Sequence, residues 1–269
     1  MRSKRIAALS SALLLAHGVP ARAETGDPCL VGRPELVWAA RAVTGEEIEL
    51  VDGRRLRLAS ASLPRASLGP DGPARRPAAN RLAETARARL ETLVEARELA
   101  FHDLGADRHG RRRGHLLDTE TGQWIEAEMV AAGLLRVTPE PDDRLCARAL
   151  LASERSARAA ATGLWAPDAF PVLAADVPLD RVVGDWVVVE GVIRSVGRSG
   201  RRIWLNFGDD IRRDFAVALD DNHRERFRAG GLDPDRLRGA RVTVRGIVSW
   251  RTGPRIEIEG PEEIERAKR

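Results

Sequence analysis

Apolar and polar positions alternate with two different periods along this chain. In the first part, short segments alternate every second residue, and Leu56 and Leu58 alternate with Arg55 and Arg57 just after an Asp52-Gly53 turn. This pattern predicts a hairpin with arginines on one face. Strands are expected at residues 37–43, 47–51, 56–61, 99–101 and 113–117.

Other segments follow the helical period. Leu82, Ala86 and Leu90 fall on one face of a helix, which predicts packing against the strands. Helices are expected at residues 78–96, 124–132 and 142–161. The Pro- and Gly-rich segment 67–77 is expected to be a loop.

Short β segments return after a Pro-rich stretch. Strands are expected at residues 182–196, 203–207, 215–219, 240–250 and 255–258, with a short helix at residues 222–228. Ile203 and Leu205 should fill a small barrel, while Arg202 and Trp204 occupy the opposite face of their strand. The order resembles an oligonucleotide/oligosaccharide-binding (OB) fold, with Trp186 and Trp250 in its core.

The N-terminus has the pattern of a secretory signal. Basic residues precede an apolar run at residues 6–15, and Ala21-Arg22-Ala23 resembles a cleavage site. A membrane anchor is the competing interpretation, but the run is nearer the roughly 7 to 15 residues of a signal core than the roughly 20 of a spanning helix. We therefore expect residues 1–23 to be a signal peptide and the mature protein, which has no transmembrane segment, to be exported, either periplasmic or secreted.

Signal removal changes the charge balance. The formal net charge of the whole chain is +4, and residues 1–23 hold four basic residues and no acidic one, so the mature chain is neutral. Overall basicity therefore gives no argument for a nucleic-acid partner. Basic residues outnumber acidic ones only after residue 180, and arginine replaces lysine almost everywhere, so runs of arginine are weak evidence by themselves.

Cys29 and Cys146 are the only cysteines. In an oxidising compartment an isolated pair most simply forms one disulfide, here between the N-terminal tail and a later helix. Two buried free thiols are the other interpretation. Neither cysteine has metal-ligand spacing.

Four stretches in order resemble the thermonuclease (staphylococcal-nuclease-like) family across residues 36–165. They are Val43-Thr44-Gly45-Glu46-Glu47-Ile48, Asp52 to Arg65, Asp107-Arg108-His109-Gly110-Arg111, and Glu154 to Trp165. The resemblance implies a mainly β fold with helices (α+β). A thermonuclease-like OB barrel with three helices at residues 24–166 would be joined by a linker at 167–180 to a second small OB-like β-barrel at 181–265.

Members of this family hydrolyse phosphodiester bonds with a Ca²⁺ ion held by two carboxylates and a carbonyl, a glutamate that activates water, and two arginines on the phosphate. The resemblance places Arg57 and Arg111 at the arginine positions and Glu46 at the first metal aspartate. The second metal aspartate corresponds to Ser62, and the water-activating glutamate corresponds to Arg65. Phosphate binding with weak or absent hydrolysis is expected. Ca²⁺ is the one cofactor implied, and only by the resemblance.

The expected partner is DNA, RNA or another polyanion, with Arg202 and Trp204 as an additional stacking platform. An equal interpretation is that Trp204 covers the barrel end or the contact between the domains. An active Ca²⁺-dependent or rewired nuclease is the first alternative, in which Glu47 or Asp71 substitutes for a missing carboxylate. A non-catalytic module that binds protein or cell envelope is the second alternative. The oligomeric state is left open.

Two further expectations concern surface groups. By strand alternation, Glu47 should be a solvated charge beside the hairpin. The histidines at 102, 109 and 115 should likewise be surface groups, because no carboxylate or cysteine spacing supports a metal cluster.

Overall fold

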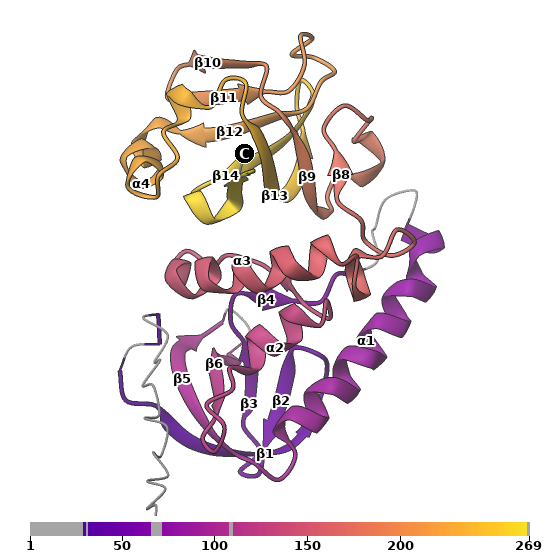
Figure 1. Ribbon diagram of the computed structural model, residues 1–269, viewed down its shortest axis with the longest axis vertical. Coiled ribbons are helices and arrows are strands. Elements are labelled where there is room, and N and C mark those ends of the chain that lie inside the picture. Colours follow the sequence, from indigo (N-terminus) through magenta and orange to yellow (C-terminus); the bar gives the residue numbers. More distant parts are fainter. Residues whose placement is uncertain (1–28, 31, 66–71, 108–109, 268–269) are drawn as a thin grey trace, which may run out of the picture.

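The computed structural model describes residues 29–30, 32–65, 72–107 and 110–267. The expected signal peptide and Asp71 lie outside these residues. The fold is mainly β with helices, and it contains a closed barrel and a second, barrel-like sheet, as the sequence predicted. In Figure 1 the second sheet lies across one long helix from the first barrel.

The first barrel is closed in the order β1-β2-β3-β6-β5. Its strands are β1 (Glu35–Ala42), β2 (Glu47–Leu50), β3 (Arg55–Leu58), β5 (Glu98–Ala106) and β6 (Arg112–Asp118). Leu56 and Leu58 point into its core, as their alternation predicted. Only the β3–β6 pair is parallel among these neighbours, with Arg57 beside Arg113.

Helices cover this barrel, and a short strand pair lies beside it. They are α1 (Gly72–Val94), α2 (Ile125–Ala131) and α3 (Arg144–Ala159), with β4 (Ala61–Ser62) pairing β7 (Arg136–Val137). The expected loop at 67–77 is wrong for residues 72–77, which form the start of α1. Pro77 has no N–H, so the backbone hydrogen bond from position 77 to the carbonyl of residue 73 is missing, and the helix continues without it.

The second sheet runs in the order β10-β11-β12-β14-β13-β9-β8, with β15 on β13. The elements are β8 (Leu173–Ala174), β9 (Trp186–Val192), β10 (Ser195–Ser199), β11 (Arg202–Asn206), β12 (Ala216–Asp220), α4 (Arg224–Ala229), β13 (Arg241–Trp250), β14 (Pro254–Ile258) and β15 (Ile264–Arg266). Short 3-10 turns occupy Gly163–Trp165, Asp180–Val182, Asp221–His223, Pro234–Arg236 and Pro261–Glu263. Ile203 and Leu205 are fully buried in the core of the sheet, as expected.

A buried ion-pair network joins the two parts. Arg245 of β13 is completely buried, and its Nη1 donates to Glu154 Oε1 of α3 at 2.7 Å while its Nη2 pairs with Glu265. The other oxygen of Glu154 accepts a 2.6 Å hydrogen bond from the N–H of Val137. The two sheets are therefore held together through α3.

Trp186 lies at the same boundary rather than deep in one core. The guanidinium of Arg136 stands 4.1 Å from the centre of its ring and donates to the Trp186 carbonyl at 2.9 Å. Burial of this guanidinium lowers the pKa of Arg136 to about 10. The cation remains charged at neutral pH and forms part of the contact between the domains.

Among the described residues, we find no helix whose length and apolar content would let it cross a membrane.

Candidate functional site

Arg57 and Arg111 come together because β3 pairs in parallel with β6. Arg57 projects from β3, and its Nη2 donates to Glu140 Oε1 at 2.6 Å. Arg111 immediately precedes β6; its Nε donates to Asp107 Oδ2 at 2.9 Å and its Nη1 to Glu47 Oε2 at 3.0 Å. Arg57 Nε also lies 3.9 Å from Asp107 Oδ2, so one carboxylate stands beside both guanidinium groups.

We name this group the arginine–carboxylate cluster. Its members are Arg57, Arg111, Arg113, Glu47, Asp107, Glu140 and Asp142. Hydrogen bonding to Asp107 raises the pKa of Arg111, and hydrogen bonding to Arg113 lowers the pKa of Asp142. With three guanidinium groups and four carboxylates, the cluster is not a positively charged patch in itself.

The carboxylates of this cluster were the part that sequence reasoning missed. Glu47 was expected to be a solvated surface charge, and that was wrong: its residue is only 5% exposed because Arg55 and Arg111 cover the carboxylate. Glu140 and Asp142 lie in the segment before α3, more than eighty residues from Arg57. An acidic run there was the only available signal, and it has no periodicity.

The residues that the resemblance assigns to the family's metal positions are bonded to other groups of the protein. Glu46 Oε2 accepts a 2.6 Å hydrogen bond from the N–H of Leu63, and Glu46 Oε1 lies 3.8 Å from Arg65 Nη2. Ser62 Oγ shares a 2.6 Å hydrogen bond with Thr138 Oγ1. Because Ca²⁺ takes about 6 to 8 oxygen ligands, usually including several carboxylates, this donor set does not fit the family's Ca²⁺ ion.

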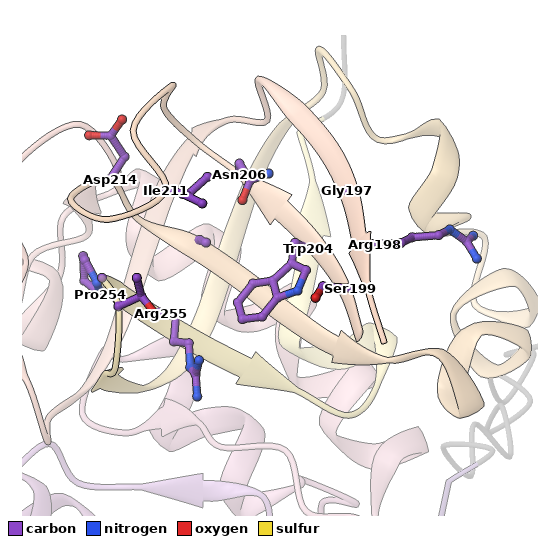
Figure 2. Close-up of a pocket in the computed structure, with 12 residues that line it drawn as sticks. Gly197, Arg198, Ser199, Trp204, Asn206, Ile211, Asp214, Pro254 and Arg255 are labelled. Atoms are coloured by element: carbon purple, nitrogen blue, oxygen red, sulfur yellow. The ribbon is translucent and has the colours of Figure 1, made fainter. Parts of the chain in front are cut away.

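A second candidate surface lies on the outer face of β11, β12 and β14. Trp204 lines a cavity of about 360 Å³ together with Asn206, Asp214 and Arg255 (Figure 2). The Arg255 guanidinium stands 5.6 Å from the centre of the indole ring. Arg202 does not line the cavity; its Nη1 lies 2.8 Å from Glu257 Oε2 on the neighbouring part of the sheet.

Trp250 was expected to pack in the core, and that was wrong. It lies at the end of β13 and is 46% exposed. Strand alternation alone did not separate it from the buried apolar residues of β13.

Cys29 and Cys146 form a disulfide in the structure, with sulfurs 2.09 Å apart. Cys146 lies in the first turn of α3 and is buried. The bond attaches the chain before β1 to the helix that contacts both sheets.

His115 of β6 is buried, which makes its expected surface position wrong; His109 lies outside the described residues. The Nδ1 atom of His115 lies 3.2 Å from Glu126 Oε1, and its Nε2 atom lies 3.0 Å from Asp143 Oδ2. Burial by itself would lower the pKa of His115, but hydrogen bonds to Asp143 and Glu126 raise it to about 10. The imidazolium is therefore a buried cation between two carboxylates at neutral pH.

A pH-dependent stability follows. The raised pKa of His115 means that the folded protein binds a proton that the unfolded chain releases near pH 6.5. The stabilisation is complete below pH 6.5 and is lost as the pH rises to about 10. The free energy of unfolding should therefore fall through this window, by at most about 1.4 kcal/mol per pH unit.

Urea unfolding of the wild type and of His115→Gln across this window tests the expectation. The chain has no tyrosine, and its cysteines are bonded, so few other groups titrate here. The variant should be less stable at pH 6.5 and should show a flatter pH dependence. An equal slope in both proteins would show that His115 is not the group responsible.

The closed barrel β1-β2-β3-β6-β5 with its flanking helices defines the fold class of the first part, an OB-type barrel. Residues 55–167 match the family model described as Staphylococcal nuclease homologue. The chain thus contains a staphylococcal-nuclease-like domain over these residues, which confirms the resemblance seen in the sequence. The match includes Arg57 and Arg111 but begins after Glu46. None of the curated proteins compared with the chain matches it.

Proposed function

We propose that this protein is an exported member of the staphylococcal-nuclease-like family that binds nucleic acid through phosphate contacts and hydrolyses it weakly or not at all. Arg57 and Arg111 are the phosphate ligands. The N-terminal pattern at residues 1–23 and the Cys29–Cys146 disulfide support export to an oxidising compartment.

One observation carries the loss of hydrolysis. Within a domain that matches the nuclease family, the motif resemblance assigns Ser62 and Arg65 to the positions of a metal carboxylate and of the water-activating glutamate. A hydroxyl bonded to Thr138 is a weak metal ligand, and a guanidinium accepts no proton from water. Since a general base typically contributes about 10² to 10⁴ in rate, its absence alone removes most of the activity.

The carboxylates of the cluster take part in binding as competitors. Glu140 Oε1 accepts a 2.6 Å hydrogen bond from Arg57 Nη2, in the position where a phosphate oxygen would accept it. A phosphodiester that displaces Glu140 would receive the same charge-assisted hydrogen bonds. Binding is thus an exchange of one anion for another, and its affinity depends on how strongly Glu140 competes.

Digestion of single-stranded DNA by residues 24–269 with Ca²⁺, with Mg²⁺ and with chelator tests this function. We expect no metal-dependent cleavage beyond that of an Arg57→Ala preparation, which controls for contaminating nuclease. Metal-dependent cleavage that disappears in Arg57→Ala would refute the proposal in favour of a rebuilt catalytic site.

Measurements of DNA binding distinguish this proposal from the alternative of a module that binds protein or cell envelope and no nucleic acid. Arg57→Ala should weaken DNA binding by at least tenfold at low salt, and Glu140→Gln should strengthen it because the competing anion is removed. Arg89→Ala, on the exposed side of α1, removes one charge outside the cluster and should change little. An equal loss of DNA affinity in Arg57→Ala and Arg89→Ala would mean that the protein attracts DNA only through nonspecific charge, and it would contradict a phosphate site at Arg57.

Trp204 extends the proposed binding surface to the second sheet. Stacking on an aromatic ring contributes about 1 to 3 kcal/mol per base, so Trp204→Ala should weaken binding of single-stranded DNA by about 5- to 150-fold. Arg202→Ala should lower the salt dependence of binding. Trp250→Ala is the matched control, because Trp250 is exposed on the same sheet but does not line the Trp204 cavity. Fluorescence anisotropy with a labelled oligonucleotide measures all three, and equal affinity of Trp204→Ala and wild type would remove Trp204 from the surface.

A further inference from the structure

The surroundings of His115 hold more ligand chemistry than the proposed function uses. Side-chain ligand atoms of His115, Asp143 and Cys146 all lie within 4.8 Å of one another, and all three residues are buried. They come from β6, from the residue before α3, and from the first turn of α3. A nitrogen, an oxygen and a sulfur thus converge in one interior space.

In the disulfide-bonded protein this space is closed to a metal ion. The Cys146 sulfur is bonded to Cys29, so it is not a thiolate. Both imidazole nitrogens lie within hydrogen-bond distance of carboxylates, and the proton on Nε2 occupies the line between His115 and Asp143. The Nε2 proton of His115 and the sulfur of Cys29 thus occupy the ligand positions that a cation would need.

We propose that freeing Cys146 from Cys29 creates a binding site for a divalent transition metal of the zinc type, with His115 Nε2, Asp143 and the Cys146 thiolate as ligands. A set of one nitrogen, one sulfur and one oxygen suits Zn²⁺, which takes four ligands at about 2.0 to 2.3 Å, with water in the position that the three side chains leave open. Such bonds place ligand atoms about 3.3 to 3.8 Å apart. The observed spacing therefore requires only small movements.

The residues around these ligands support the assignment. Glu126 lies 3.2 Å from His115 Nδ1, the arrangement in which a carboxylate orients a metal-binding imidazole. Ser60 Oγ donates to Asp143 Oδ2 at 2.5 Å and fixes that carboxylate. The helix N-terminus beneath Cys146 favours its thiolate form. Ligands and their partners are thus held by four segments: β6, α2, the start of α3, and the residues between β3 and β4.

The chemical steps balance with a dithiol as the reductant. The dithiol supplies two electrons and two protons, becomes a disulfide itself, and leaves Cys29 and Cys146 as thiols. Metal binding then releases the thiol proton of Cys146 and the Nε2 proton of His115. Oxidation to the disulfide would expel the ion, so metal and disulfide exclude each other.

Cys29→Ser frees Cys146 without any reductant and provides the test. Co²⁺ is the probe, because a thiolate ligand gives it an intense near-ultraviolet charge-transfer band and a tetrahedral site gives it visible bands. We expect one Co²⁺ per folded Cys29→Ser molecule, displacement by Zn²⁺, and a higher melting temperature with Zn²⁺. The oxidised wild type should show none of these.

Two further variants keep the test decisive. Cys29→Ser/Cys146→Ser lacks the disulfide equally but should lose the charge-transfer band, and Cys29→Ser/Asp143→Asn should bind Co²⁺ at least tenfold more weakly. Circular dichroism establishes that each protein is folded. A folded Cys29→Ser without the thiolate band, or with a spectrum unchanged by the Cys146→Ser substitution, would overturn the proposal.

Discussion

Replacing Arg245 by methionine should lower the free energy of unfolding by about 3 to 5 kcal/mol. Arg245 is completely buried, and its guanidinium is paired with Glu154, which is also fully buried, and with Glu265. Methionine fills a similar volume but leaves the Glu154 carboxylate without its principal counter-charge. A buried carboxylate in that state must either remain charged in an apolar setting or take up a proton, and both are unfavourable.

Urea unfolding followed by tryptophan fluorescence measures the loss. Arg241→Met is the matched control, since Arg241 lies on the same strand, its side chain is 59% exposed, and Glu190 is its ion-pair partner among the residues that the structure describes. This variant should cost less than about 1 kcal/mol. The double variant Arg245→Met/Glu154→Gln should recover part of the loss because no charge remains unpaired. Equal stabilities of Arg245→Met and Arg241→Met would contradict the importance of the buried pair.

Removing the disulfide should have an effect of similar size. Cys29 and Cys146 are separated by 117 positions, and a closed loop of that length restricts the unfolded chain by about 3 to 5 kcal/mol. The variant Cys29→Ser/Cys146→Ser should unfold at a correspondingly lower urea concentration. Its dependence on urea should steepen, because the unfolded chain becomes more expanded.

The wild type treated with a dithiol in the absence of metal serves as the control for the serine side chains. It should unfold at nearly the same urea concentration as the double variant. A loss below about 1 kcal/mol in both proteins would mean that the chain before β1 is held as firmly by its other contacts as by the covalent bond.

The elements that the sequence predicted well are those with local signals. The alternation around Leu56 and Leu58 was sufficient for β3, and Ile203 with Leu205 was sufficient for the inward face of β11. Each depends on residues a few positions apart. The start of α1 was missed because proline and glycine normally indicate a loop, whereas here the helix begins at Gly72 and continues past Pro77.

The candidate site was predictable only on its cationic side. Arg57 and Arg111 follow from motifs, but Glu140 meets Arg57 through the fold alone, 83 positions along the chain. Periodicity describes which face a side chain occupies and not what covers that face, so Glu47 was assigned to solvent. His115 was misassigned for the same reason, because its carboxylate partners lie on α2 and just before α3.

The shared contact along α3 has a consequence for any long ligand. Since Arg245 joins β13 to α3 through a completely buried ion pair, the two sheets do not behave as modules on a flexible tether. For modules on such a tether, the length of the tether sets the local concentration of the second site once the first is occupied. In this protein the distance between the Arg57 and Trp204 surfaces is instead set by the rigid fold. A polymer that is to contact both the Arg57 and the Trp204 surfaces must therefore exceed a minimum length, below which its affinity should drop abruptly rather than gradually.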